Sequence, residues 1–350
     1  MILFWTAVLL LALLTYVVLD GYDLGIGTLT LFERDGDTQR HMLDVVGNVW
    51  DGNESWLVLI AMGLWAGFPD AYATALPGLY LPLCLMLFGL IFRGFAIEMT
   101  LHRPGFDRVW GRVFGIGSLV TAFAQGVLFG GLLAGITVVD QRFAGRTWDF
   151  LGHGYALLTG CATVLLYTWA GAAQLQAKLA ADERQQAGRR VRLLTGPVLL
   201  ASVLSAILLP LATRAHLRLD GVGRWLPFSY GLLVAAGAFY AAWRWAGRAP
   251  RHVSFVATCA AQVAGLLALT CLYFPQLVPP SVTIYSAAAG RTTLVFLAVM
   301  LGVFGPVTVA YGVYAHWVFR AAPSPVPELP FTDLRPSRLS TVDVNGSQHG

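Results

Sequence analysis

The stretch VVLDGYDLGIG, residues 17–27, places two carboxylates, Asp20 and Asp23, inside the first hydrophobic run of the chain. The surrounding residues, approximately 2–32, are almost entirely apolar. A run of this length is sufficient for a helix that crosses about 30 Å of hydrocarbon. The stretch therefore predicts a membrane helix with acids inside it, and ionisable groups within a membrane are typically functional.

Composition extends this prediction to the whole chain. Of its 350 residues, 57% are hydrophobic and 12% are charged, and its mean hydropathy is +0.65. These values exclude a water-soluble globular domain and predict an all-α integral membrane protein. We expect nine transmembrane helices, arranged as two four-helix bundles and one additional helix. No basic residue precedes the first apolar run, so we interpret it as a retained helix and not as a cleaved signal peptide.

The nine expected spans are hydrophobic runs separated by polar loops. They cover approximately residues 2–32, 50–69, 71–98, 112–139, 150–177, 192–213, 225–245, 253–273 and 291–319. Together they form one membrane domain, residues 1–320. Residues 321–350, which begin AAPSPVPELP, are proline-rich and polar, and they predict a disordered tail.

The distribution of basic residues predicts the orientation. Of the 23 lysines and arginines, 17 fall on the side of the carboxyl terminus. The positive-inside rule therefore places the amino terminus outside and the carboxyl terminus in the cytoplasm. Because these basic residues are scattered between spans, they do not indicate a nucleic-acid partner.

The second and third spans add polar groups at the cytoplasmic depth of Asp20 and Asp23. Between the motif WDGNESW, residues 50–56, and the turn at Pro69 there are too few apolar residues to cross the membrane. The polar residues of the motif must therefore lie within the membrane or at its edge. They are Trp50, Asp51, Asn53 and Glu54. The third span ends FRGFAIE, which contains Arg93 and Glu98. We therefore expect three helices to bring their polar groups together on one side.

These acids allow two interpretations. An acid at the centre of a membrane helix costs about 2.5–3.5 kcal/mol, so such groups should pair, hydrate or face the bundle interior. In the first interpretation Arg93 pairs with Asp51 or Glu98 and has a structural role, as Glu98 does, while the other acids lie at the membrane interface. In the second, Asp51, Asp23, Asp20 and Glu54 form a proton path that opens on the cytoplasm.

Small residues indicate where helices approach one another. Gly21 and Gly25 in the first span, and the pairs 126/130 and 131/135 in the fourth, have the spacing of close helix contacts. Gln125 in the fourth span is predicted to hydrogen-bond to a neighbouring helix.

The histidines do not form a haem site. His252 and His316 lie at span ends, so His153, just inside the fifth span, is the only candidate ligand, and no second histidine shares its depth. No bound metal is therefore predicted. Acids are dense in the first three spans and absent from the middle of the later ones, which argues against an inverted-repeat transporter. This asymmetry favours a partner subunit with a functional first half and a scaffold second half.

Five segments in order along the chain resemble subunit II of the cytochrome bd family of terminal quinol oxidases, including its cyanide-insensitive branch. They are LDGYDLGIG (19–27), VWDGNESWLV (49–58), FRGFAIE (92–98), GSLVTAFAQGVLFGG (117–131) and GPVTVAYGVYAHWVFR (305–320). The resemblance covers nearly the whole chain.

The resemblance implies a nine-helix subunit without haem in the bacterial inner membrane. Its partner, subunit I, would carry haems b and haem d, oxidise quinol near the outer face and reduce oxygen to water. Protons would come from the cytoplasm through Asp51, with Asp23 as a further relay. The resemblance leaves open a structural quinone in this subunit and a small single-helix accessory subunit.

Two other functions remain open from the sequence. The same acids could serve a proton-coupled secondary transporter that acts alone. Alternatively, the chain could be a purely structural stabiliser of subunit I, whose polar residues only fix helix packing.

Overall fold

The computed structural model describes the chain apart from residues 48, 103–106, 140–141, 150–153, 214–221 and 319–350. The predicted tail, residues 321–350, therefore lies outside the described residues, as does His153. The helices are α1 (Ile2–Thr30), α2 (Gly36–Gly47), α3 (Trp50–Gly67), α4 (Pro69–Gly78), α5 (Tyr80–His102), α6 (Asp107–Ala134), α7 (Gly154–Lys178), α8 (Ala181–Ala212), α9 (Val222–Trp245), α10 (Val253–Tyr273) and α11 (Arg291–Val318). Two short hairpins complete the fold, β1 (Val138–Val139) with β2 (Arg142–Phe143) and β3 (Gln276–Val278) with β4 (Val282–Thr283).

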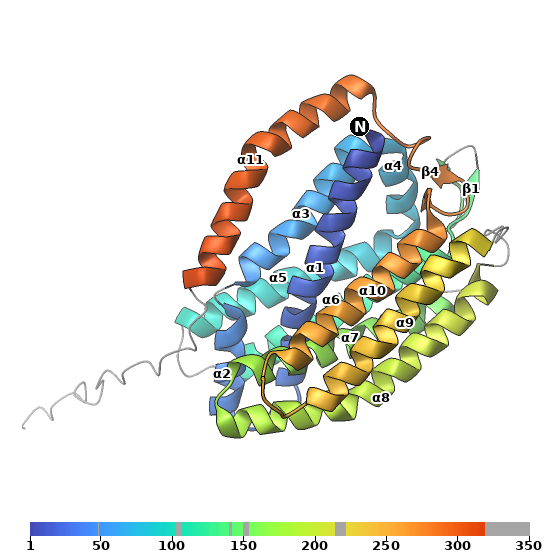
Figure 1. Cartoon of the computed structure of the whole chain (residues 1–350). Helices are drawn as coiled ribbons and strands as arrows, with labels where there is room; N and C mark the ends of the chain where they lie inside the picture. Colours follow the sequence, from blue (N-terminus) through green and yellow to red (C-terminus); the bar gives the residue numbers. More distant parts are fainter. Residues whose placement is uncertain (48, 103–106, 140–141, 150–153, 214–221, 319–350) are drawn as a thin grey trace, which may run out of the picture.

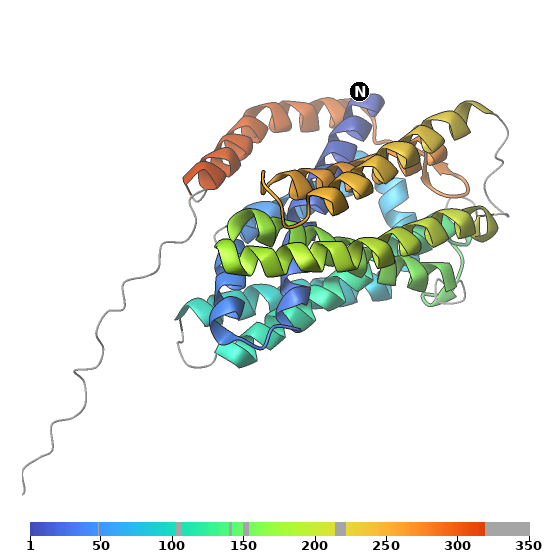
Figure 2. The same cartoon turned by 60° about the horizontal axis from the view of Figure 1, so that its bottom comes forward.

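The number of membrane spans agrees with the sequence. Within the described residues, eight helices are long and apolar enough to cross a membrane, and the bent pair α3–α4 makes up to nine. The predicted all-α membrane fold is confirmed. Helices α1, α3, α5 and α6 form one group and α7 to α10 a second, with α1, α6 and α7 packed at the seam between them. Figures 1 and 2 show α11 as the additional helix, running along the outside of the molecule.

The second and third predicted spans differ from the structure at their junction. Residues 71–98 were expected to form one span, but α4 ends at Gly78 and α5 begins at Tyr80. Helices α3 and α4 meet at 117°, because proline at the first position of α4 has no N–H to continue the α3 hydrogen-bond ladder. The buried ring of Phe68 fills this corner, and the backbone N–H of Ala289 donates to Gly67 O across it at 2.9 Å.

Several helix ends also differ from the predicted boundaries. Helix α6 was expected to reach residue 139 but ends at Ala134, because Gly135 adopts a positive φ of 89° that terminates the helix. Gly135 therefore lies outside α6, and the predicted 131/135 pair is not a helix-packing motif. Helix α8 was expected to begin at residue 192 but begins at Ala181, so its first turns extend beyond the predicted span.

Helix α2 was not predicted. It lies beside the carboxyl-terminal end of α1, at the end of the molecule where α3 begins (Figure 1). Met42, Leu43 and Val46 form its buried side. The Gln39 amide donates to the carbonyl of Thr30 at 3.1 Å, which satisfies a free carbonyl at the end of α1. Helix α2 thus covers the end of the bundle next to the acidic motifs.

Candidate functional site

A buried ionic cluster joins α1, α3 and α5. The Arg93 guanidinium on α5 donates to Asp20 on α1, with 2.6 Å between Nη1 and Oδ1, and to Glu54 on α3, with 3.1 Å between Nη2 and Oε2. The side chains of Arg93 and Asp20 are fully buried, and that of Glu54 is 26% exposed. The predicted convergence of three helices is therefore present in the structure.

Asp23 occupies a separate place one turn further along α1. The Asn53 amide donates to Asp23, with 2.7 Å between Nδ2 and Oδ2, and lies 3.1 Å from the hydroxyl of Tyr22. Asp23 and Asn53 are both fully buried. Whereas Asp20 has a cation as its partner, the hydrogen-bond partner of Asp23 is a neutral amide. The two aspartates therefore differ chemically although they are only three residues apart.

Asp51 lies at the exposed edge of this cluster. It belongs to the first turn of α3, where the helix dipole favours a negative charge. Its side chain is exposed, as is that of Glu98, and the two interact electrostatically. The expectation that Arg93 pairs with Asp51 or Glu98 is wrong. Arg93 reaches Asp20 and Glu54 instead, because its side chain points into the bundle, with its guanidinium 6.0 Å from the centre of the Trp50 ring.

Several buried polar atoms of the cluster have no hydrogen-bond partner among the described residues. They are Asp20 Oδ2, Asp23 Oδ1, Asn53 Oδ1 and Arg93 Nε. Buried polar groups in proteins are almost always satisfied by protein atoms or by water. Arg93 bonds to two of the carboxyl groups, those of Asp20 and Glu54, while the carboxyl group of Asp23 accepts from the neutral Asn53 amide. The cluster can therefore accommodate additional protons or water.

A second polar group lies about one helical turn further from the carboxyl-terminal end of α1, where α1, α6 and α7 meet. The Gln125 amide of α6 donates to the Tyr16 hydroxyl at 2.6 Å, and the Tyr167 hydroxyl of α7 donates to Gln125 Oε1 at 3.0 Å. The prediction that Gln125 bonds to a neighbouring helix is confirmed. Tyr16, Tyr22 and Tyr167 were not predicted from the sequence to be part of the site. Tyr16 could have been found, because it lies one helical turn from Asp20.

Glycines allow these helices to approach one another. A Cβ at Gly25 would overlap the backbone carbonyl of Tyr167, and one at Gly171 would lie 2.5 Å from the backbone nitrogen of Ile26. Gly126 and Gly130 of α6 similarly face Thr159 of α7. The predicted contact role of the pairs 21/25 and 126/130 is therefore confirmed. Close backbone contact brings residues of α1, α6 and α7 within hydrogen-bonding distance.

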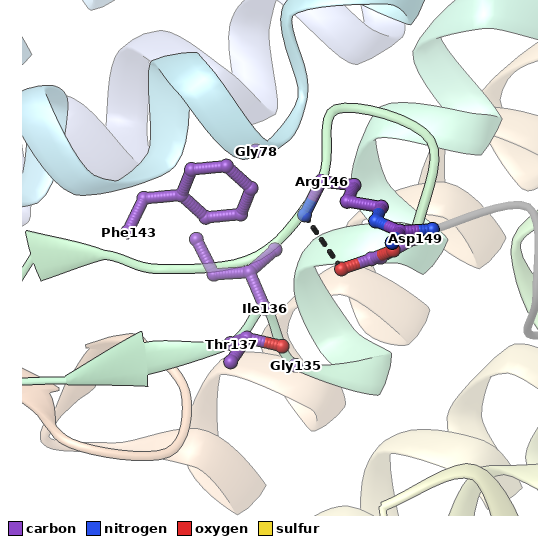
Figure 3. A pocket seen from close by; sticks show the side chains of 7 residues that line it. All are labelled: Gly78, Gly135, Ile136, Thr137, Phe143, Arg146 and Asp149. Carbon is purple, nitrogen blue, oxygen red and sulfur yellow. Dashed lines mark hydrogen bonds between the residues drawn. The ribbon is translucent and has the colours of Figure 1, made fainter.

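The remaining described residues contain no comparable site. The pocket in Figure 3 lies between α4, the end of α6 and the β1–β2 hairpin. Its cavity of about 30 Å³ has room for roughly one or two water molecules. Asp149 accepts the backbone N–H of Arg146 at its edge, at 2.7 Å. Within the described part of the chain, no three His, Cys, Asp or Glu side chains are grouped so that they could hold a metal ion.

Comparison with known proteins shows the family to which the chain belongs. A family model described as cytochrome bd terminal oxidase subunit II matches residues 1–319. The chain is 30% identical over 208 residues to cytochrome bd ubiquinol oxidase subunit 2 of Bacillus subtilis (strain 168), which covers 58% of this chain and 61% of that protein. It is 33% identical over 180 residues to cytochrome bd-I ubiquinol oxidase subunit 2 of Escherichia coli (strain K12), which covers 49% of this chain and 47% of that protein.

The matches to these curated relatives thus span about half to three fifths of their lengths. A solved structure of bd oxidase from Geobacillus thermodenitrificans has a similar fold, with a TM-score of 0.76. The alignment covers 91% of this chain and 97% of that chain at 17% identity. At this identity the likeness shows that the two chains share their fold.

Proposed function

Because this chain belongs to the family of cytochrome bd terminal oxidase subunit II, we propose that it acts as the second subunit of a quinol:oxygen oxidoreductase in the bacterial inner membrane. Its partner would be a larger membrane subunit that carries haems b and d. In that complex, quinol is oxidised near the outer face and oxygen is reduced to water. The haems would supply the electron chemistry, and this chain would scaffold the partner and deliver protons.

The observation that carries this proposal is the buried cluster formed by Asp20, Asp23, Asn53, Glu54 and Arg93. Each charged side chain at the centre of a membrane helix costs about 2.5–3.5 kcal/mol. A buried cluster with more acids than bases is therefore better explained by function than by a contribution to stability. The exposed side chain of Asp51 begins a series of polar groups that continues into the bundle. Such an arrangement suits proton uptake from the end of the molecule that carries α2.

The two buried aspartates would have different tasks. Asp20 bonds to Arg93 at 2.6 Å and would remain an anion that compensates the guanidinium. Asp23 has a neutral amide as its hydrogen-bond partner, so it can lose and regain a proton without breaking an ion pair. The path would therefore run from Asp51 to Asp23, with Glu54 at its side. Arg93 and Asn53 would fix the geometry, and Glu98 would lie next to the opening.

The orientation follows from the same proposal. The described ends of α1, α5, α7 and α9, together with the beginnings of α3, α6, α8 and α10, lie on the side with the excess of arginines. This side would face the cytoplasm. Protons would be taken up inside while quinol oxidation releases protons outside. The complex would thereby generate a proton gradient without a pump.

Purification tests the assignment as a subunit. The protein extracted mildly from its native membrane should bring with it a second large membrane subunit, and the preparation should show optical bands of haems b and d. It should also consume oxygen with quinol as the donor. A colourless preparation without a partner would contradict the oxidase subunit and favour a transporter that acts alone.

Substitution of the acids tests the proton path. Asp51→Asn and Asp23→Asn should each slow quinol-driven oxygen consumption, while the haem spectrum and the amount of assembled complex stay normal. Asp70→Asn is the matched control, because Asp70 is an exposed acid in the first turn of α4, at the opposite end of α3. Full turnover of both variants would contradict the proton path. It would favour the alternative that the chain only stabilises its partner structurally.

A further inference from the structure

The hydrogen bonds of Tyr16, Gln125 and Tyr167 all have the same direction. The Tyr167 hydroxyl donates to Gln125 Oε1, and Gln125 Nε2 donates to the Tyr16 oxygen. Tyr16 and Tyr167 are each only 3% exposed. Because the Tyr16 oxygen accepts from Gln125, the proton of its own hydroxyl points away from the amide. The two hydrogen bonds therefore run in one direction, from α7 through α6 to α1.

Asp20 is the acceptor to which the Tyr16 hydroxyl can donate a hydrogen bond. Tyr16 lies four residues before Asp20 on α1, so their side chains share one face of the helix. The two groups are close enough to interact electrostatically. Asp20 Oδ1 is occupied by Arg93, while the buried Oδ2 has no partner at standard hydrogen-bond geometry among the described residues. A donor and an acceptor that both need a partner thus lie next to each other.

The tyrosine ring of α7 is held in place by the shape of α1. A Cβ at Gly21 would lie 2.8 Å from Cε1 of Tyr167, so only glycine leaves room for this ring beside Asp20. Gln125 is fixed at both ends by tyrosine hydroxyls. Hydrogen bonds that point in one direction polarise one another, and the last donor of such a chain interacts more strongly with an anion.

From this geometry we infer that Tyr16, Gln125 and Tyr167 are positioning residues that hold Asp20 as a permanent anion beside Arg93. The exchangeable proton of the cluster then belongs to Asp23. Because these hydrogen bonds run in the direction of Asp20, they also oppose the passage of a proton from Asp20 to Gln125. The proton path therefore ends at the acidic cluster. This inference rests on the proposed proton-uptake function.

Infrared spectroscopy of the intact protein, purified with whatever partner it carries, tests this inference without turnover. The wild type should show the carboxylic C=O band of a buried acid. This band should be absent from the spectrum of Asp23→Asn and present in that of Asp20→Asn. Tyr16→Phe removes the last donor and should introduce a second carboxylic band. That band should be absent from the double variant Tyr16→Phe/Asp20→Asn, which identifies it as Asp20.

Graded controls separate this role from a loss of packing. Tyr167→Phe removes a donor two bonds away from Asp20 and should give a weaker second band than Tyr16→Phe. Tyr273→Phe removes a buried hydroxyl that donates to Leu133 O at 3.0 Å, within a hydrophobic cluster that contains no residue of the ionic cluster, and should leave the spectrum unchanged. If Tyr16→Phe and Tyr273→Phe give the same spectrum as the wild type, the inference is wrong. The oxygen-consumption test of Asp51 and Asp23 would then stand or fall separately.

Discussion

Among single side chains, Arg93 is the one on which the buried cluster depends. It is fully buried and donates to two acids from different helices. Removal of one partner from a buried ion pair leaves an uncompensated charge, which destabilises a protein by about 3–5 kcal/mol. The structural and electrostatic roles of the cluster are therefore inseparable at this position.

Arg93→Gln should strongly reduce the amount of folded protein in the membrane, because Asp20 and Glu54 lose their cation. We expect a lower melting temperature of the purified protein, measured by the fluorescence of its tryptophans. The double variant Arg93→Gln/Asp20→Asn should recover part of the loss, since it removes one of the two uncompensated charges. Equal melting temperatures of Arg93→Gln and the wild type would contradict the structural importance of the pair.

A second ion pair, formed by Glu33 in the loop after α1, makes stability depend on pH. The Arg190 guanidinium of α8 lies 2.5 Å from the Glu33 carboxylate, which follows α1. Burial alone would raise the pKa of Glu33, but hydrogen bonds from Arg190 and from the backbone N–H groups of Asp35 and Arg34 hold this pKa below its ordinary value. The folded state therefore favours the ionised form of Glu33.

The sign of this effect can be tested with Glu33→Gln. A lowered pKa in the folded state gives stability that is present above the unfolded value of about 4.3 and is lost as the pH falls through the folded value. Glu33→Gln should therefore melt at a lower temperature than the wild type at pH 7, and the difference should vanish in acid. Asp37→Asn, at an exposed acid of α2, controls for the loss of one surface charge. A difference that persists unchanged at low pH would refute the ion-pair explanation.

The sequence predicted which residues meet but not how they pair. Asp20, Asp23, Asn53, Glu54 and Arg93 could be assigned to one depth from their positions in three apolar runs. The partner of Arg93 could not be predicted, because Asp51 and Glu54 lie on the same face of α3 and differ by less than one turn. That choice depends on how the helices are rotated and spaced in the bundle, which arises from packing and leaves no signal in a single sequence.

At the scale of helices, the contact between α1 and α7 is set by glycine. Gly25 faces the backbone of Tyr167, and Gly171 faces the backbone of Ile26. Neither neighbour is a flexible side chain, so an added methyl group cannot be accommodated by rotamer changes. The two helices would have to separate, and overpacking of this kind costs about 1–3 kcal/mol.

Gly25→Ala and Gly171→Ala should therefore each lower the melting temperature. Both should also weaken the hydrogen bonds of Gln125, which depend on the same helix contact. Gly265→Ala in α10 is the matched control, because a Cβ there meets no atom within 4 Å. It should leave the melting temperature unchanged or slightly higher, since alanine favours helix more than glycine does. Equal effects of all three substitutions would show that the α1–α7 contact is not limited by space.

Helix α2 shows what hydropathy alone cannot find. It is amphipathic and too polar to be identified as a span, although Gln39, Met42, Leu43 and Val46 have helical spacing. Asp35 also marks its beginning, since its carboxylate accepts the backbone N–H of Thr38 at 2.9 Å. Both signals are present in the sequence. The bend at Pro69 was likewise visible as a proline, but the 117° angle depends on the packing of Phe68 and the loop at Ala289.

At the scale of the whole molecule, the two halves have different chemistry. The buried charges lie on α1, α3 and α5, whereas the described buried residues of α8 to α10 are mostly apolar or hydroxyl-bearing. Helix α11 lies apart, and only 6% of its most apolar window is buried. Its first turn is attached to α1 by the Trp5 indole, which donates to Leu294 O at 2.9 Å. Its exposed apolar side chains, including Phe296, Phe304 and Tyr311, suit contact with lipid or with a membrane partner.

The proposed function requires that protons enter from the cytoplasmic side through Asp51 and Asp23. The most direct measurement is proton uptake during oxygen reduction, followed with a pH-sensitive dye on the cytoplasmic side of vesicles that contain the purified complex. We predict that Asp23→Asn slows proton uptake about tenfold or more, since a relay residue is lost, while haem content stays normal and Asp70→Asn behaves as the wild type. Proton uptake by Asp23→Asn at the wild-type rate would show that Asp23 is not part of the proton path.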